Sequence, residues 1–340
     1  YEAPFVQGPT STVSANNLSV TGNWHDFDPG VGVDIAQDFT LAAGRNMTIS
    51  LQWDEPYLTG APGSSGSASD IDIYLLNTDT NTFVAGSTAN NLGGDPSELF
   101  SYTNTSGFTQ NLAILIDRFS GPAPNELKYV DFRSRTLEGA EYATLSGTSI
   151  GHNSAEGGLG VGAAFYQQTP DFTGTKPETA PVLESFSSTG GTPFYFDVNG
   201  NRLAVQEDRQ RVDITAPDGV DTTFFGGSDP DGTGFNNFFG TSAAAPNAAA
   251  LAALMLEIDN TLTPTEIYDA MERTAIDIVT TSDGFVLAEG YDQSSGFGLV
   301  DGQRALGFVG AQSAGDDFGE TPGTAGSLTL GGSATGEIEV

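Results

Sequence analysis

The chain has 340 residues, 38% of them hydrophobic, so it is long enough for two domains and apolar enough to bury a core. Its 11 Lys and Arg residues against 44 Asp and Glu residues give a formal net charge of -33, which excludes nucleic acid and anionic membranes as partners held by charge. Cysteine is absent, which excludes disulfides and thiolate metal sites. No run is long enough to predict a transmembrane span.

Between about residues 24 and 131, apolar and polar residues alternate with a period of two. The clearest runs are residues 47–53, 70–75 and 112–116, separated by clusters of Gly, Asn, Ser and Thr. Such runs predict antiparallel strands, each with one buried face. Several of them in succession predict an all-β sandwich, which we place at residues 24–140.

Two acidic pairs are candidate ligands for calcium, which takes oxygen ligands. Asp70 and Asp72 are expected on one face of their strand, with Asp95 as a loop ligand. We favour the alternative that they are solvent-facing carboxylates on an edge strand. Asp229 and Asp231 lie in an Asp-Pro-Asp-Gly sequence, which is a strong turn signal by itself.

Residues 239–246, Phe-Gly-Thr-Ser-Ala-Ala-Ala-Pro, open an apolar run that predicts a helix buried inside a large domain. Gly240 allows a sharp entry to this helix, and we place Pro246 in its first turn. Ser242 would then lie where free N–H groups and the helix dipole favour developing negative charge, as an acyl-transfer nucleophile requires. The alternative is that Thr241 or Ser242 is only the helix N-cap.

Residues 263–266, Thr-Pro-Thr-Glu, form a capping box that predicts a second helix to about Thr274. From Ala314 the chain is rich in Gly, Ser and Thr, and alternating apolar residues near 328–330 and 338–340 predict two short strands. This tail is either a frayed linker or a strand exchanged into a neighbouring copy.

The serine segment and four others, in the same order along the chain, resemble subtilisin-like serine proteases. They match the family's "AVGA", "FSSxG", "DIxAPGV" and "GxGxVDA" segments at residues 159–163, 184–190, 212–220 and 295–301. Asn247 stands where the family usually has His, and Ala250 where it has Gly.

The resemblance implies a fold class and a domain order. The fold is α/β subtilisin-like, represented by its C-terminal half with a parallel-sheet core and a buried serine helix, plus an inserted all-β antiparallel sandwich. The expected parts are a partial subtilase segment or linker, the inserted sandwich, the C-terminal catalytic half, and a tail that starts a further β-domain or is an exchanged strand. They span residues 1–23, 24–140, 141–312 and 313–340.

The resemblance also implies roles. Ser242 is the nucleophile, Gly240 and Thr241 complete its loop, and the Ser242 N–H contributes to the oxyanion hole. The family's Asp, His and oxyanion Asn are not matched in this chain. We expect His25 and His152 to be structural or surface histidines. Without a base, the serine hydroxyl is a weak nucleophile.

These expectations lead to a secreted subtilisin-like endopeptidase that acts on polypeptides, with Asp, His and Asn supplied by an upstream polypeptide. Its partner would be the N-terminal half of the same protease. The alternative is an inactive structural subunit of an extracellular assembly, joined to identical copies through the C-terminal strand. A sedolisin-like Ser-Glu-Asp protease shares the Gly-Thr-Ser-Ala signal and needs no histidine. The spread of acidic residues indicates a bacterial or archaeal protein from a marine or saline environment.

Overall fold

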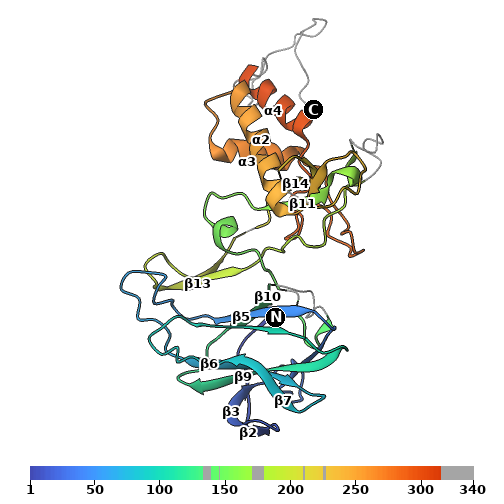
Figure 1. Cartoon of the computed structure of the whole chain (residues 1–340). Coiled ribbons are helices and arrows are strands. Elements are labelled where there is room, and N and C mark those ends of the chain that lie inside the picture. Colours follow the sequence, from blue (N-terminus) through green and yellow to red (C-terminus); the bar gives the residue numbers. More distant parts are fainter. Residues whose placement is uncertain (133–138, 145, 171–179, 210, 225–226, 315–340) are drawn as a thin grey trace, which may run out of the picture. The chain divides into compact units, whose positions relative to one another are not determined.

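The computed structural model describes residues 1–132, 139–144, 146–170, 180–209, 211–224 and 227–314. The chain divides into two compact units (Figure 1). Unit 1 comprises residues 1–146 and 193–208, and unit 2 comprises residues 147–192 and 209–340. The predicted tail strands lie outside the described residues.

Unit 1 consists of two antiparallel sheets and a hairpin. The first sheet has the order β1-β10-β5-β8, formed by Glu2–Ala3, Leu127–Asp131, Asn46–Trp53 and Ser97–Thr103. The second has the order β2-β3-β9-β6-β7, and β4 also pairs with β9. Its strands are β2, Gln7–Ser14, β3, Ser19–His25, β4, Gln37–Leu41, β6, Asp70–Asn77, β7, Thr82–Ser87, and β9, Gln110–Ser120. The hairpin joins β12, Pro193–Phe196, to β13, Arg202–Asp208.

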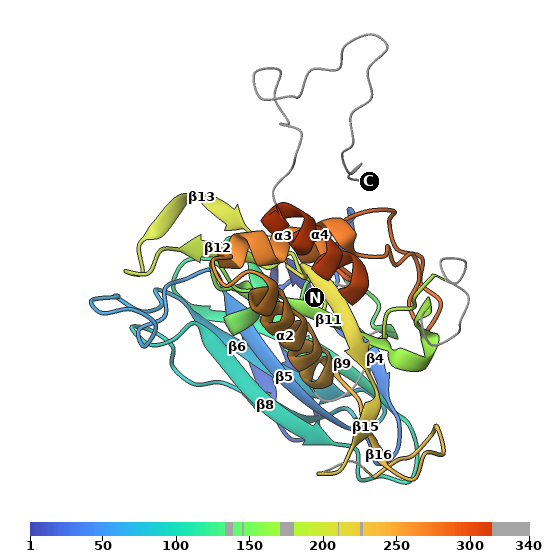
Figure 2. The same ribbon diagram turned by 90° about the horizontal axis from the view of Figure 1, so that it is seen from above.

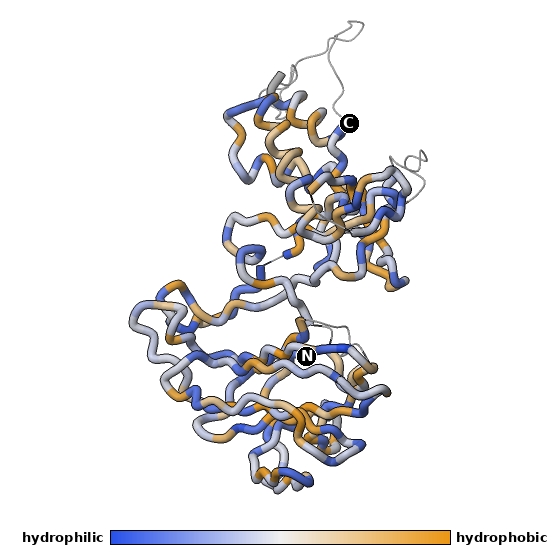
Figure 3. The backbone as a smooth tube through the Cα atoms, viewed as in Figure 1, coloured by the Kyte–Doolittle hydropathy of each residue, from blue (hydrophilic) through white to orange (hydrophobic). Residues whose placement is uncertain are grey.

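The period-two pattern correctly predicts strands β5, β6 and β9, but the expectation of one buried face holds for β5 and is wrong for β6 and β9, which have buried residues on both faces. Along β5, alternate residues from Met47 to Trp53 are buried, and they share one core with alternate residues of β6 and β9 from the other sheet. In Figure 3 the strands of unit 1 change repeatedly between hydrophilic and hydrophobic colours. The mainly antiparallel pairing agrees with the predicted all-β part of the chain.

Unit 1 is larger than the predicted range of residues 24–140. Residues 1–23 are not a linker, because β1 pairs with β10 and β2 pairs with β3. The hairpin of residues 193–208 also belongs to unit 1, although it is far away in the sequence. Long-range pairing therefore sets boundaries that local composition did not indicate.

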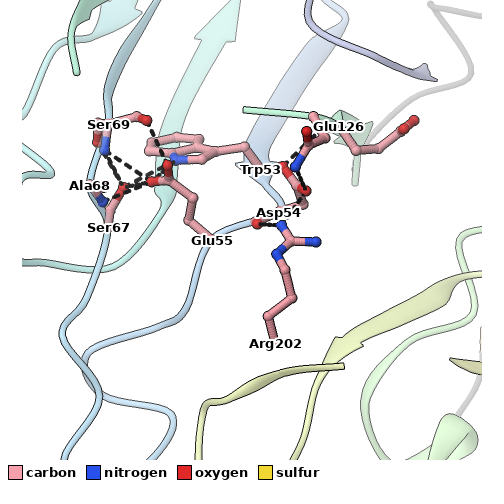
Figure 4. Close-up of polar contacts among 9 residues, drawn as sticks. Trp53, Asp54, Glu55, Ser67, Ala68, Ser69, Glu126 and Arg202 are labelled. Atoms are coloured by element: carbon pink, nitrogen blue, oxygen red, sulfur yellow. Dashed lines mark hydrogen bonds and ion pairs between the residues drawn. The ribbon is translucent and has the colours of Figure 1, made fainter. Parts of the chain in front are cut away.

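A polar network connects this hairpin to the end of β5 (Figure 4). Asp54 is 4% exposed, pairs with Arg202 of β13, and accepts hydrogen bonds from Asn125 Nδ2 and the Glu126 N–H at 3.0 Å each. The adjacent Glu55 carboxylate accepts from the Trp53 indole at 3.1 Å and from backbone and hydroxyl groups of residues 67–69. Both acidic side chains thus fix loops within unit 1.

The favoured reading of Asp70 and Asp72 as solvent-facing carboxylates on an edge strand is wrong. β6 lies between β9 and β7, and both side chains are 5% exposed. Asp72 accepts a hydrogen bond from the Tyr74 hydroxyl at 2.9 Å, two residues along the same strand face. Burial raises the pKa of Asp72 to about 7.

Unit 2 contains the described α-helices and a parallel strand pair. β11, Val161–Phe165, pairs in parallel with β14, Ile214–Asp218, and β15, Val220–Thr222, pairs with β16, Asn236–Phe238, as a hairpin. The helices are α2, Thr241–Ile258, α3, Pro264–Thr274, and α4, Gly302–Ala314; short 3-10 turns lie at Gly151–Ser154 and Tyr166–Gln168. Seen from above, α2 lies along β11 with α3 and α4 beside it (Figure 2).

The capping box predicted for α3 is present, with the Thr263 side chain and Glu266 bonded reciprocally. The prediction that α2 is buried on all sides is wrong, because only one face packs on unit 2. Ala244, Ala248, Leu251 and Met255 enter the core with β11 and β14, whereas Leu254, Leu256 and Ile258 are 48%, 40% and 45% exposed.

No membrane span was expected from the sequence. Among the residues that the structure describes, α2 is nevertheless long and apolar enough to cross a membrane, by length and composition alone. Helices in protein cores meet the same criterion, and α2 packs on β11 and β14.

Candidate active site

Ser242 is the second residue of α2 and its side chain is exposed. The first N–H groups of a helix have no partner within the helix, so Ser242 combines an accessible hydroxyl with a positive dipole end. The predicted nucleophile therefore has the surroundings expected for stabilising an oxyanion.

Gly240 has φ 114° and ψ 159°, a region that essentially only glycine occupies. It is the N-cap of α2, and its carbonyl accepts from the N–H groups of Ala243 and Ala244 at 2.8 and 3.2 Å. No side chain caps this helix. The alternative that Thr241 or Ser242 serves as the N-cap is therefore wrong.

Pro246 lies in the second turn of α2 and not in the first, because the helix already begins at Thr241. Its missing N–H leaves the Ser242 carbonyl without the usual i+4 donor. The next residue, Asn247, donates from Nδ2 to the carbonyls of Pro217 and Ala243 at 2.8 and 3.2 Å. This side chain links the start of α2 to the end of β14.

Asp218, the last residue of β14, is the charged side chain that contacts this entry. It is fully buried, and its Oδ2 accepts from the Gly240 N–H at 2.7 Å. Burial raises the pKa of Asp218 to about 6; the Gly240 N–H opposes the rise and the Glu184 carboxylate adds to it. Asp218 was not among the predicted site residues, although an additional Asp inside the "APGV" pattern was a visible signal.

Comparison with known families identifies the chain. Residues 58–301, more than two thirds of it, match the model of the subtilase family. This protein belongs to the subtilase family. No curated protein matches the sequence. Subtilases are serine proteases, which agrees with the exposed serine at the start of α2.

The two histidines of this subtilase lie in different units, His25 in unit 1 and His152 in unit 2 with Ser242. His25 is fully buried in unit 1, with Tyr1 Oη at 2.8 Å from Nε2 and the Val6 N–H donating to Nδ1 at 3.3 Å. Burial lowers the pKa of His25 to about 4, so it stays neutral at physiological pH. His152 is exposed in the turn Gly151–Ser154 of unit 2. A hydrogen-bonded and a surface histidine are what we predicted.

The predicted calcium ligands in the loop near the serine have protein donors as partners. Asp229 accepts from the N–H groups of Thr233 and Gly234 at 3.1 and 3.0 Å. Asp231 accepts from Tyr166 and from Asn237 Nδ2, and these bonds lower its pKa. Among the described residues, no three His, Cys, Asp or Glu side chains are arranged to hold a metal ion. Calcium binding stays a prediction, and no chemical step depends on it.

Proposed function

We propose that this chain contributes Ser242 as the nucleophile of a subtilisin-like serine endopeptidase. The observation that carries the proposal is the exposed Ser242 at a helix N-terminus that no side chain caps. It follows Gly240, whose backbone conformation favours glycine, and it lies inside the subtilase match. In the acylation step, Ser242 Oγ attacks the scissile carbonyl and a base removes its proton. The C–N bond then breaks, the base gives that proton to the leaving amine, and the acyl group stays on Ser242 as an ester that water hydrolyses. The Ser242 N–H donates to the oxyanion that forms.

The base, its orienting Asp and the oxyanion Asn are proposed to come from an upstream polypeptide segment. Support comes from the exposed residues of α2, which are spaced three or four apart and therefore share one helix face. They are Ser242, Ala245, Ala249, Ala253 and Leu256. The nucleophile thus lies at the end of an uncovered apolar stripe. A segment that covered the stripe would bring its own side chains next to Ser242.

Secretion, a saline bacterial or archaeal environment and polypeptide substrates belong to the same proposal. The net charge of -33 and the absence of cysteine support a protein that works at high ionic strength without disulfides. Substrate preference would be set largely by the segment that completes the site.

The alternative is a structural subunit in which Ser242 does not react. The surroundings of His25 favour it, because this histidine is buried in unit 1 and both its ring nitrogens have hydrogen-bond partners there, Tyr1 Oη and the Val6 N–H. The apolar stripe on α2 would then pack against identical copies.

A fluorophosphonate probe separates the two functions. Native material is treated with the probe, and intact mass and peptide mapping locate any adduct, with an active subtilase as the positive control. We expect one adduct on Ser242 in native material and none on the isolated chain, which lacks a base. Native material that stays unlabelled would contradict the protease function and favour the structural subunit.

A further inference from the structure

Asp218 is the one buried carboxylate that contacts the serine loop in the described part of unit 2. Its side chain is 0% exposed, Oδ2 is 2.7 Å from the Gly240 nitrogen, and Oδ1 has no hydrogen-bond partner among the described residues. Burying a carboxylate with one oxygen unpartnered is unfavourable. The contribution of Asp218 to stability alone therefore does not explain an aspartate at this position.

The chain path explains why this carboxylate reaches Gly240. β14 ends at Asp218, a turn at Gly219 starts the hairpin of β15 and β16, and the Gly219 N–H donates to the Phe238 carbonyl at 2.9 Å. The hairpin therefore returns the chain to its starting point, two residues before α2. This return brings the Gly240 N–H within hydrogen-bond distance of the Asp218 carboxylate.

The Gly240 peptide needs an external partner. Glycine has no side chain to restrict its backbone, and α2 has no side-chain cap. The Gly240 N–H precedes the helix, so helical hydrogen bonding does not fix it either. A carboxylate acceptor forms a stronger bond to this N–H than a neutral one and is favoured by the helix dipole.

We propose that Asp218 is a positioning residue, which holds the Gly240 N–H and thereby fixes the peptide planes that orient Ser242 Oγ and the Ser242 N–H. The proposal rests on Ser242 being the nucleophile. Asp218 itself touches no reacting atom. Glu184 is the charged neighbour that acts on the carboxylate, and its negative charge favours the protonated form. Protonated Asp218 still has an acceptor oxygen, but the bond to Gly240 is weaker.

The direct test uses NMR of the full chain labelled with ¹⁵N-glycine and ¹⁵N-serine. The amide signals of Gly240 and Ser242 are followed between pH 4.5 and 8 in the wild type, Asp218→Asn and Asp218→Ala. We expect a downfield Gly240 proton that titrates with a midpoint near pH 6 in the wild type. Asp218→Asn keeps an acceptor oxygen, so its Ser242 signal stays near the wild-type position and the titration is lost. Asp218→Ala moves both signals.

Gly307, an exposed residue of α4, is the control signal and should not move in either variant. Unchanged Gly240 and Ser242 signals in Asp218→Ala would overturn the proposal. Equal movement of Gly307 would also overturn it, because the effect would then be general unfolding. If Asp218→Ala does not fold, Asp218→Asn decides: a wild-type-like titration of Gly240 in this variant contradicts the assignment.

Labelling kinetics separate this inference from the protease function. Where native wild-type protein is labelled by the fluorophosphonate, Asp218→Ala should react at least tenfold more slowly and Asp218→Asn within threefold of the wild type. Equal rates in all three would overturn the positioning role. If the wild type is not labelled but the NMR signals behave as expected, the protease function fails and Asp218 still positions the loop.

Discussion

Gly240→Ala tests whether the backbone before Ser242 requires glycine. A Cβ at this position would meet only the Ser242 nitrogen, at 3.8 Å, which is an ordinary contact. The cost is therefore conformational. Backbone in this region costs a residue with a side chain about 1–3 kcal/mol. Alanine also restricts the unfolded chain, which offsets about 0.4–1 kcal/mol and leaves a net loss of about 1–2 kcal/mol.

Gly307→Ala is the matched control. Gly307 lies inside α4 and is exposed, and a Cβ added to it would meet no atom within 4 Å apart from the neighbouring backbone of its own helix. Alanine should stabilise this helix by about 0.5–1 kcal/mol. Both changes are glycine to alanine, so their unfolded-state contributions are equal. The difference between the two variants therefore measures the native backbone at Gly240.

The two units can be followed separately in urea. Both tryptophans, Trp24 and Trp53, belong to unit 1, whereas the described α-helices all belong to unit 2. Circular dichroism at 222 nm thus follows unit 2, and tryptophan fluorescence follows unit 1. Gly240→Ala should lower the urea midpoint measured at 222 nm without changing the slope of that transition. The urea midpoint measured by tryptophan fluorescence should stay the same. A variant as stable as Gly307→Ala would refute the conformation assigned to Gly240.

Two further predictions concern unit 1 and use tryptophan fluorescence. The pKa of Asp72 is raised from 3.8 to about 7, so the folded state binds the proton more tightly and unit 1 should lose stability as pH rises from about 4 to 7. Asp72→Asn should remove much of this loss; a midpoint independent of pH in the wild type would contradict it. Arg202→Ala leaves the buried Asp54 carboxylate without its cation and should lower the free energy of unfolding by about 1–3 kcal/mol. Arg273→Ala, the control, removes an ion pair with Asp269 on the surface of α3 and should lower it by less than about 0.5 kcal/mol. Equal effects of the two arginine changes would show that the Arg202 pair does not anchor the hairpin.

Hydrophobic periodicity and the capping box correctly predicted those strands and helices whose own residues carry a clear pattern. β5 and α3 follow their patterns residue by residue, and Ser242 is found at a helix start as expected. The hairpin at residues 193–208 could not be assigned to unit 1, because its Arg202 contacts Asp54, a residue 148 positions away in the sequence, through an ion pair and a hydrogen bond to the Asp54 carbonyl.

Polarity patterns also failed where a polar residue is buried. Alternation places Asp72 on the polar face of its strand but cannot tell that β6 is an inner strand with Tyr74 against that carboxylate. Asp218 is similar, because its role depends on a hairpin that returns the chain to Gly240. Such contacts arise from topology, which a single sequence indicates only weakly.

Within the described part of unit 2, α2 is covered on one face only, and two adjacent residues of this helix can test whether another segment packs on the other face. Met255 is fully buried and Leu256 is 40% exposed. Met255→Ala should cost about 2–5 kcal/mol in the transition at 222 nm, as large-to-small core changes do. Leu256→Ala should cost less than about 0.5 kcal/mol, as surface substitutions usually do. Similar losses would mean that the chain itself covers the Leu256 face, and the proposal that another segment packs there to complete the site would lose its support.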